Sequence, residues 1–470
     1  MRYIERTCWG FFCTALLLTA CRGEDEPRKT GASANKQVNE WIDGTMRDHY
    51  LWYEEIPEKG ELDYEADPTD FYFSLLSDRD GKDLPSGHQY FSTITKKTDS
   101  KALPPTDGSA TYGIDYMPYL VDDAPYYFLR VNYVLPGSPA AEAGIERGQW
   151  IVKQNNSVIS QPYSLSAGGA TTLMLARFDA TGMLSPVGIA SVPAARTVEN
   201  SPFLLDSVYT VNGRKIAYLV YNHFSSGYDY TDKTYDNRMK QIFARFKAEG
   251  ATECILDLRY NGGGLVSSAC LMTSLLAPAS ALDGVFCIER YNDKQNPQER
   301  QLEMDKSAGS ANLNLNRLYV IMSERSASAS ELVVNSLRSY MGESRVVLIG
   351  NRSVGKNVGS FTYKPSQNYG YEIAPIAFYV YNKDGQADYD NGFVPDILFD
   401  EFDISDRDFQ DLGCTEEDLL KIALAQITGS AYDTGRSFFR GTKARTTGWK
   451  AAGAAPLPLP FPPGSLLDIK

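Results

Sequence analysis

The chain has 470 residues, with 46 Lys and Arg against 59 Asp and Glu, a formal net charge of −13, seven Cys and three His. At ~150 residues per domain this length predicts about three folded units, and 43% hydrophobic and 12% aromatic residues exclude a disordered chain. The acidic balance argues against nucleic acid or an anionic membrane surface as the main partner. The three His are too scattered for a metal site, and we expect no metal and no cofactor.

The first 20 residues have the pattern of a secretory signal. Arg2 and Arg6 precede an apolar run of 12 residues, Trp9–Ala20, which is too short to span a hydrocarbon core of ~30 Å. A short membrane anchor or a buried helix is the alternative. The end of the run, Leu18–Cys21, resembles the bacterial lipobox, whose cysteine is acylated and becomes the first residue of the mature protein.

This resemblance implies a lipoprotein. We expect residues 1–20 to be removed as a signal peptide, Cys21 to carry the lipid, and residues 21–36 to be a flexible tether. The folded part would then lie in the bacterial cell envelope, on the periplasmic or surface face of the outer membrane, and only the lipid would reach the membrane.

The four cysteines after Cys21 have no C-x-x-C spacing, which argues against zinc. They are Cys254, Cys270, Cys287 and Cys414. Cys254 lies in an apolar run and Cys270 in a stretch of small residues, which favours buried free thiols at both.

Residues 37–100 are expected to form a helical N-terminal region. Apolar residues recur there at helical spacing, at Val38, Trp41, Ile42, Met46 and Tyr50, and again in a patch at Phe71, Phe73, Leu75 and Leu76. Residues 101–110 have the composition of a linker.

Residues 108–197 are expected to form a β-rich unit, because short β-like runs such as Tyr127–Val134 surround a turn-rich segment. In that segment, Pro136–Ile145, a Pro-Gly turn leads into one Ala-rich helical turn that Gly144 ends. The pattern resembles the PDZ domains of bacterial proteases, with Gln149 where these usually have Asp.

The PDZ resemblance implies peptide binding. Tyr112, Gly113 and Ile114 match the carboxylate-binding loop and first strand of such a domain. There an extended peptide adds to a sheet edge, and its C-terminal carboxylate meets backbone N–H groups. A PDZ-like unit that only packs or gates is the alternative.

Residues 201–430 alternate predicted strands with predicted helices, which indicates an α/β core. The strands are expected at Lys215–Tyr221, Glu253–Leu258, Leu318–Ser323 and Val346–Ile349, and the helices at Tyr235–Glu249, Val266–Leu276, Glu331–Tyr340 and Glu416–Ile427. Residues 431–470 are rich in Gly, Ala and Pro and are expected to be a disordered tail.

Two stretches of this core carry candidate chemistry. Asp257–Gly264 ends in three Gly, where backbone N–H groups can turn toward an oxyanion or a phosphate; an ordinary turn is the alternative. Ser326–Glu331 lies between a predicted strand and a predicted helix, where a Ser points out of the sheet beside the helix N-terminus. Ser328 and Glu331 also have the spacing of a capping box, so a purely structural role is the alternative.

A third stretch, Gly350–Asn357, nearly fits the phosphate-binding loop G-x-x-x-x-G-K-S/T. Asn357 lacks the hydroxyl that Mg²⁺ needs, and Val358–Tyr363 reads as a strand where that loop requires a helix. These two departures argue against nucleotide binding.

In their order along the chain, the PDZ-like segment, these three stretches and Asn391–Asp396 resemble the S41 family, the C-terminal processing or tail-specific peptidases. The resemblance covers about residues 40–430. It implies an α/β fold, with a ClpP/crotonase-like S41 peptidase core at 201–430, an inserted β-rich PDZ-like domain and a helical N-terminal region.

By position, the resemblance makes Ser328 the nucleophile, Lys356 the general base and Glu331 a residue that orients the lysine. It places the oxyanion hole at the backbone N–H groups of Ala329 and of Gly264 or Gly263. Ser326 and Ser330 are the competing nucleophiles.

A lysine deprotonates a serine only if its pKa falls from ~10.4 toward neutrality, which burial beside Val354 and Val358 would achieve. A tricorn-like branch of the superfamily instead uses a His from the N-terminal region, and His88 lies roughly where that His would come. We take Lys356 as the base and treat His49 and His223 as structural.

The expected function is that of a serine endopeptidase of the cell envelope. It would cleave partly unfolded or C-terminally presented polypeptides through an acyl-enzyme. The alternative is a non-catalytic peptide- or ligand-binding envelope lipoprotein on the same fold.

Overall fold

The structure of the protein is a computed structural model. It describes residues 31–84, 87–96, 110–121, 125–162, 165, 168–179, 182–229, 231–367, 369–403, 409–431, 450–451 and 466–467. The expected signal peptide, the lipidated Cys21 and most of the expected tail therefore lie outside the described residues.

The core of the chain is a six-stranded sheet in the order β20-β16-β15-β11-β10-β9. Its strands are β9 (Phe203–Val211), β10 (Arg214–Tyr221), β11 (Glu253–Asp257), β15 (Leu318–Met322), β16 (Val346–Gly350) and β20 (Ile397–Leu398). All neighbours are parallel except β9 and β10, which are antiparallel. The expected α/β core is confirmed.

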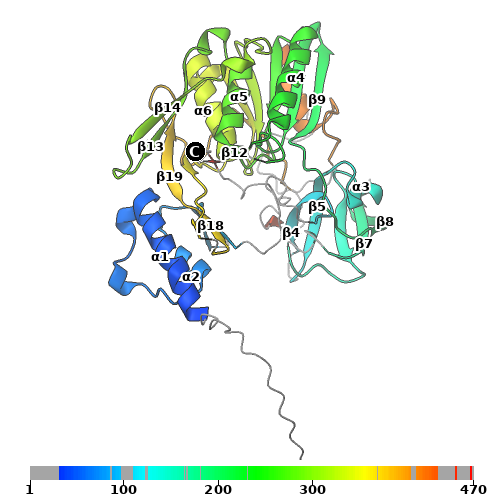
Figure 1. The fold of residues 1–470 in the computed structure, drawn as a ribbon. Helices are drawn as coiled ribbons and strands as arrows, with labels where there is room; N and C mark the ends of the chain where they lie inside the picture. Colours follow the sequence, from blue (N-terminus) through cyan, green and yellow to red (C-terminus); the bar gives the residue numbers. More distant parts are fainter. Residues whose placement is uncertain are drawn as a thin grey trace, which may run out of the picture.

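Helices cover both faces of this sheet (Figure 1). They are α4 (Thr234–Ala248), α5 (Val266–Leu276) and α6 (Ala329–Met341) on one face and α7 (Asp418–Thr428) on the other. Successive side chains of a strand point to opposite faces, so β10 packs Ala217 and Leu219 toward the first group and Ile216 and Tyr218 toward α7. Short 3-10 turns connect the elements at η3 (Ala279–Ala281), η4 (Lys306–Ala308) and η5 (Glu343–Arg345).

The N-terminal region begins as expected and then departs from the prediction. It contains α1 (Gly31–His49), η1 (Tyr53–Glu55), η2 (Lys59–Glu61), α2 (Pro68–Phe73) and three short strands, β1 (Lys82–Leu84), β2 (Gly87–Gln89) and β3 (Thr93–Lys96). Strand β3 pairs with β18 (Tyr371–Ala374), far along the chain, so local periodicity could not reveal it. Helix α1 also begins inside the segment expected as a tether.

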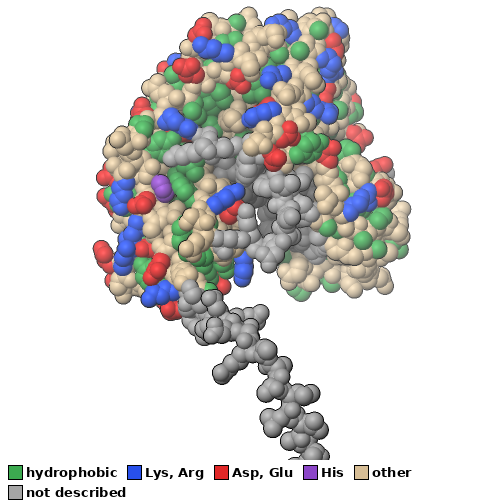
Figure 2. Space-filling view, in the orientation of Figure 1, with side chains coloured by type: hydrophobic (Ala, Val, Ile, Leu, Met, Phe, Trp, Pro, Cys, Tyr) green, Lys and Arg blue, Asp and Glu red, His purple; other side chains and the backbone are tan. Residues whose placement is uncertain are grey.

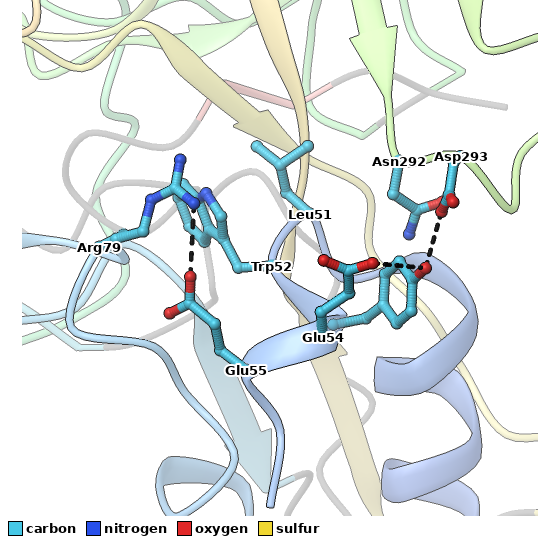
Figure 3. Close-up of a pocket in the computed structure, with 8 residues that line it drawn as sticks. Leu51, Trp52, Glu54, Glu55, Arg79, Asn292 and Asp293 are labelled. Carbon is cyan, nitrogen blue, oxygen red and sulfur yellow. Dashed lines mark hydrogen bonds and ion pairs between the residues drawn. The ribbon is translucent and has the colours of Figure 1, made fainter.

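This N-terminal region docks on the core at the lower left of Figure 1. The Leu51 amide donates to the Ile376 carbonyl (2.8 Å), and the Tyr53 hydroxyl donates to Asp293 (2.8 Å). A surface pocket opens at this junction, where Figure 3 shows Arg79 paired with Glu55 on one side and Asp293 on the other. None of the predicted site residues lines it.

A second six-stranded sheet lies beside the first, in the order β12-β22-β17-β19-β13-β14. Its strands are β12 (Gly264–Leu265), β13 (Val285–Tyr291), β14 (Glu299–Glu303), β17 (Val358–Ser360), β19 (Ile376–Tyr381) and β22 (Leu466–Leu467). Strand β22, close to the C-terminus, runs parallel to both β12 and β17, and the C-terminus is marked next to β12 in Figure 1.

The expected β-rich unit is a sheet of β4 (Ile114–Leu120), β5 (Tyr127–Val134), β6 (Trp150–Gln154), β7 (Thr171–Phe178) and β8 (Leu184–Val192), which we call the β4–β8 unit. The predicted helical turn is α3 (Pro139–Glu142), capped by the Ser138 hydroxyl, which accepts from the Ala141 amide (3.1 Å). Gln149, which replaces the usual Asp, accepts a hydrogen bond from the Glu146 amide (3.1 Å) and so stabilises the turn before β6. A strand from the tail, β21 (Lys450–Ala451), pairs with the edge strand β4.

Acidic and basic side chains are interspersed on the face shown in Figure 2, so this face carries no extended field of one sign. Within the described ranges, none of the helices is both long and apolar enough to cross a membrane.

Candidate active site

The strand β15 and the helix α6 position Ser328, which is the N-cap residue of α6 and is fully buried. Its backbone has φ 59° and ψ −111°, a conformation that L-residues other than glycine rarely adopt. Such strain costs about 1–3 kcal/mol and persists where the surrounding structure enforces it, as at the strand-to-helix turns that expose a nucleophilic serine.

The three serines of this loop differ in what their hydroxyls contact. Ser326 donates to the Leu258 carbonyl (2.7 Å), and Ser330 donates to the Asn261 carbonyl (2.9 Å). The Ser328 hydroxyl is buried and faces the Glu331 amide in a capping-box arrangement, but it makes no hydrogen bond to the described residues. Of the three, Ser328 is therefore the one whose oxygen is not held by the backbone.

Glu331 links the Ser328 turn to the Lys356 loop. One carboxylate oxygen, Oε2, accepts from the backbone amides of both Ser328 and Lys356, each at 2.8 Å. The other, Oε1, accepts from the Ser353 hydroxyl and the Gly355 amide, each at 2.6 Å. The carboxylate thus orients Lys356 through its backbone, and burial raises the pKa of Glu331 against the effect of these hydrogen bonds.

The Lys356 side chain is only 1% exposed, and its ammonium nitrogen finds no hydrogen-bond partner among the described residues. Burial lowers the pKa of Lys356 to about 7, against the opposing negative charges of Asp80 and Glu331. At this pKa about half of the lysine is the neutral amine at pH 7, whereas an ordinary lysine is almost entirely protonated there. Part of the burial comes from Phe91 of the N-terminal region, whose ring centroid lies 4.7 Å from Nζ.

Only glycine fits at position 355, directly before Lys356, because of the backbone conformation and the close packing there. Gly355 has φ +88°, and a Cβ there would lie 2.3 Å from the Asp390 carbonyl oxygen. Strand β17 begins two residues after Lys356, so the loop does not lead into a helix as a phosphate-binding loop does.

The glycine stretch Asp257–Gly264 lies directly against the Ser328 turn. The Asn261 carbonyl accepts from the Ala327 amide (3.1 Å), which joins the two stretches. The Gly263 amide donates to the Asn261 side chain (2.9 Å), so of the two glycines predicted for the oxyanion hole the geometry favours Gly264. Gly264 has φ +138°, and a Cβ there would lie 2.1 Å from the Phe224 carbonyl oxygen.

Ala329 is the first residue of α6, where an amide has no partner within the helix. The structure therefore brings Ser328, Lys356, Glu331, Gly264 and Ala329 into one neighbourhood.

The predicted peptide-binding residues belong to a different sheet, that of the β4–β8 unit. The Gly113 amide donates to the Thr111 hydroxyl (3.0 Å), and the Tyr112 hydroxyl donates to the Gly169 carbonyl. Gly113 has φ +78°, and a Cβ there would meet the Ser138 side chain at 2.2 Å. Ile114 begins β4 and is buried.

None of the three histidines is paired with Ser328. His88 contacts Asp83 through Nδ1 (2.8 Å) and the Asp80 carbonyl through Nε2 (3.0 Å), and the bond to Asp83 raises its pKa. Burial lowers the pKa of His223 to about 3, and His49 stacks on Tyr363 with ring centroids 4.5 Å apart.

Sequence reasoning missed two groups near the cluster. Asp80 and Phe91 approach Lys356 from the N-terminal region. The other group is a buried ion network around Arg259, which contacts Asp257 (2.7 Å) and Glu417 (2.6 Å) beneath the glycine stretch. The sequence signal for this network was the pair of opposite charges at Asp257 and Arg259, two residues apart at the end of an otherwise apolar strand. The four cysteines after Cys21 are free, with Cys254 and Cys270 buried as expected.

Comparison with known proteins identifies the family. A model described as peptidase family S41 matches residues 215–399, and one described as the peptidase S41 N-terminal domain matches residues 37–93. Among curated proteins, no sequence matches the chain.

Two solved structures illustrate the similarity. A crystal structure of a Bacteroides fragilis protein assigned to the S41 proteases is 31% identical and covers 83% of this chain and 97% of its own, with a TM-score of 0.71. The photosystem II D1 C-terminal processing protease is 17% identical and covers 78% of this chain and 92% of its own, with a TM-score of 0.44. The protein is thus a member of peptidase family S41.

Proposed function

We propose that the protein is a serine endopeptidase in which Ser328 is the nucleophile and Lys356 is the general base. One observation carries the proposal: the Ser328 hydroxyl, which makes no hydrogen bond to the described residues, lies on a strained N-cap, and Glu331 Oε2 accepts from the amides of both Ser328 and Lys356. The lowered pKa of Lys356 supports its role as a base.

In this mechanism neutral Lys356 takes the Ser328 proton as Oγ attacks the peptide carbonyl carbon. The amides of Gly264 and Ala329 stabilise the negative oxygen of the tetrahedral intermediate. The Lys356 ammonium then gives its proton to the leaving amine, and the C–N bond breaks to leave the acyl-enzyme. Water attacks the acyl carbon, Lys356 accepts its proton, and the ammonium returns a proton to Ser328 as the product acid leaves.

Cleavage of an unstructured protein by matched variants tests the dyad. Ser328→Ala and Lys356→Ala should each lose most activity, whereas Ser330→Ala, two residues away, should retain it. Equal activity in wild type, Ser328→Ala and Lys356→Ala would refute the dyad. Absence of activity in all of them, with retained binding of unfolded polypeptide, would instead support a binding protein.

We further propose that the substrates are partly unfolded or C-terminally presented polypeptides. The support is the β4–β8 unit, whose turn, helix α3 and following strand match the PDZ-like pattern. Hydrolysis of peptides with free and with amidated C-termini distinguishes capture of the C-terminal carboxylate from a unit that only packs or gates. A lower KM for the free carboxylate supports capture by Tyr112–Ile114, and equal KM values contradict it.

The cell-envelope location is also a proposal, and the lipobox-like Leu18–Cys21 supports it. Metabolic labelling with a fatty acid should mark the wild-type chain and leave Cys21→Ser unlabelled. Equal labelling of the two would contradict lipidation at Cys21.

A further inference from the structure

The N-terminal region places a buried carboxylate beside the proposed base. Asp80 is fully buried, and its side chain accepts from the Tyr50 hydroxyl (2.9 Å) and from the amides of Phe91 and Ser92 (3.0 Å each). The Ser92 hydroxyl makes a further hydrogen bond to the same carboxylate. Burial raises the pKa of Asp80, and the four hydrogen-bond donors and the Lys356 charge oppose this by stabilising the charged carboxylate.

The same loop contacts Lys356. The Phe91 ring lies 4.7 Å from the lysine Nζ, and the Phe91 amide is one of the donors to Asp80. The loop is fixed to the peptidase core, because the Ser92 hydroxyl accepts from the Ile376 amide of β19 (2.8 Å). Strand β19 pairs with β17, which follows Lys356 in the chain. The position of Asp80 relative to Lys356 is thus set by the sheet.

Two negative groups face Lys356, and they are arranged differently. Glu331 binds four donors on the Ser328 and Lys356 loops, so its main contacts are with the backbone. Asp80 comes from a separate element and acts on the Lys356 charge through space. The other titratable groups beside Asp80 are Tyr50, Tyr72 and His88, whose Nε2 contacts the Asp80 carbonyl. Lys82 and Tyr389 face Glu331.

We propose that Asp80 is a positioning residue for Lys356. Its carboxylate stabilises the ammonium that Lys356 becomes when it takes the Ser328 proton, and its hydrogen bonds hold the Phe91 ring against the amine. The inference rests on the proposed dyad. It gives the S41 N-terminal region a direct part in the reaction, because the peptidase core alone would lack this charge.

The first test is the pH profile of Asp80→Asn, which removes the charge and keeps the size. Loss of the negative charge lowers the pKa of Lys356, so the rising limb of kcat/KM should move to lower pH by roughly one unit. The plateau of kcat should fall about tenfold or more with KM little changed, since the ammonium is less stabilised in the transition state. The matched control is Asp83→Asn, a carboxylate three residues away that is 93% exposed, which should leave the profile unchanged.

The second test does not require activity. In a Ser328→Ala chain labelled with ¹³C at the lysine ε carbons, the Lys356 signal is assigned by its loss in Lys356→Met and titrated with and without Asp80→Asn. A lower Lys356 pKa in the Asp80 variant supports the inference even if the dyad itself fails by the cleavage assay. An unchanged or higher pKa overturns it, whatever the cleavage assay gives.

If Asp80→Asn does not fold, Tyr50→Phe decides the question. It removes one donor to the carboxylate, which then holds its charge less well, so the Lys356 pKa should move down by less than in Asp80→Asn. A residue with only a structural role would lower stability and leave that pKa in place. An unchanged or higher Lys356 pKa in Tyr50→Phe therefore contradicts the proposal.

Discussion

Arg325 and Asp115 form a two-armed ion pair, with Nη1 to Oδ1 at 2.6 Å and Nη2 to Oδ2 at 2.7 Å. Both side chains are almost fully buried. Arg325 lies three residues before Ser328, and Asp115 lies in β4, directly after the predicted peptide-binding residues Tyr112–Ile114. The pair is therefore a direct link between the β4–β8 unit and the turn that holds the proposed nucleophile.

Removing one partner leaves the other charge buried without compensation. We expect Asp115→Asn to lower the free energy of unfolding by about 3 kcal/mol and to reduce kcat/KM, because Arg325 no longer fixes the Ser328 turn. Urea unfolding and peptide hydrolysis measure the two effects.

The control for this pair is Arg177→Gln, which breaks the more exposed pair with Glu146 in the same unit and should cost less than about 1 kcal/mol. The double variant Asp115→Asn/Arg325→Gln should be less unstable than the sum of its single variants. Additive losses would show that the two charges do not interact.

The pH dependence of hydrolysis follows from the lowered pKa of Lys356. Only the neutral amine accepts the Ser328 proton, so kcat/KM should rise tenfold per pH unit below about 7 and level off above it. His88 is the control, because its pKa is raised above the usual 6.5 and it would give a limb in the same range. The limb should persist unchanged in His88→Asn. If the rising limb disappeared in His88→Asn, His88 rather than Lys356 would be the general base.

Lys356 is also expected to reduce stability. Its pKa falls from 10.5 in the unfolded chain to about 7 in the folded one. Between these values the unfolded chain binds more protons, so this group makes stability rise with pH; below pH 7 the full cost of burying the ammonium remains. Lys356→Met should therefore stabilise the protein by about 2–4 kcal/mol at pH 6 and by progressively less toward pH 10.

Urea unfolding of both chains across this pH range gives the difference directly. Lys306→Met, at a side chain that is 63% exposed, should show no such pH-dependent gain. A Lys356→Met chain that is less stable than wild type at pH 6 would mean that the buried amine has favourable partners.

Local sequence patterns predicted most of the core and only part of the site. Helix α5 matches the expected Val266–Leu276, since an apolar run bounded by a glycine stretch and a proline is visible within a few residues. Ser328 and Lys356 were predicted because short motifs carry them.

The surroundings of Lys356 could not be predicted in the same way. Asp80 and Phe91 reach it through tertiary packing across most of the chain, and no local pattern encodes such a contact. Of the two valines expected to help bury the amine, Val358 is buried and Val354 is half-buried, and the Phe91 ring, which was not expected, also faces the amine. Glu331 was expected to orient the lysine, and its Oε2 accepts a hydrogen bond from the Lys356 backbone amide rather than from the side chain.

The chain's own C-terminal segment is expected to compete with substrate. Strand β22 lies between β12, which begins at Gly264, and β17, which follows Lys356, so a peptide strand entering there must displace it. A chain ending at Ala431 should show a kcat/KM for an unstructured peptide that is higher by about threefold or more, because an attached competitor acts at a high effective concentration. A chain ending at Ala455 keeps β21 and lacks β22, and it should be activated to the same extent.

Adding a synthetic peptide of residues 456–470 should inhibit both shortened chains competitively, whereas a scrambled peptide should not. Unchanged kcat/KM in both shortened chains would show that β22 does not obstruct the site, and activation of the Ala431 chain alone would assign the effect to the pairing of β21 with β4.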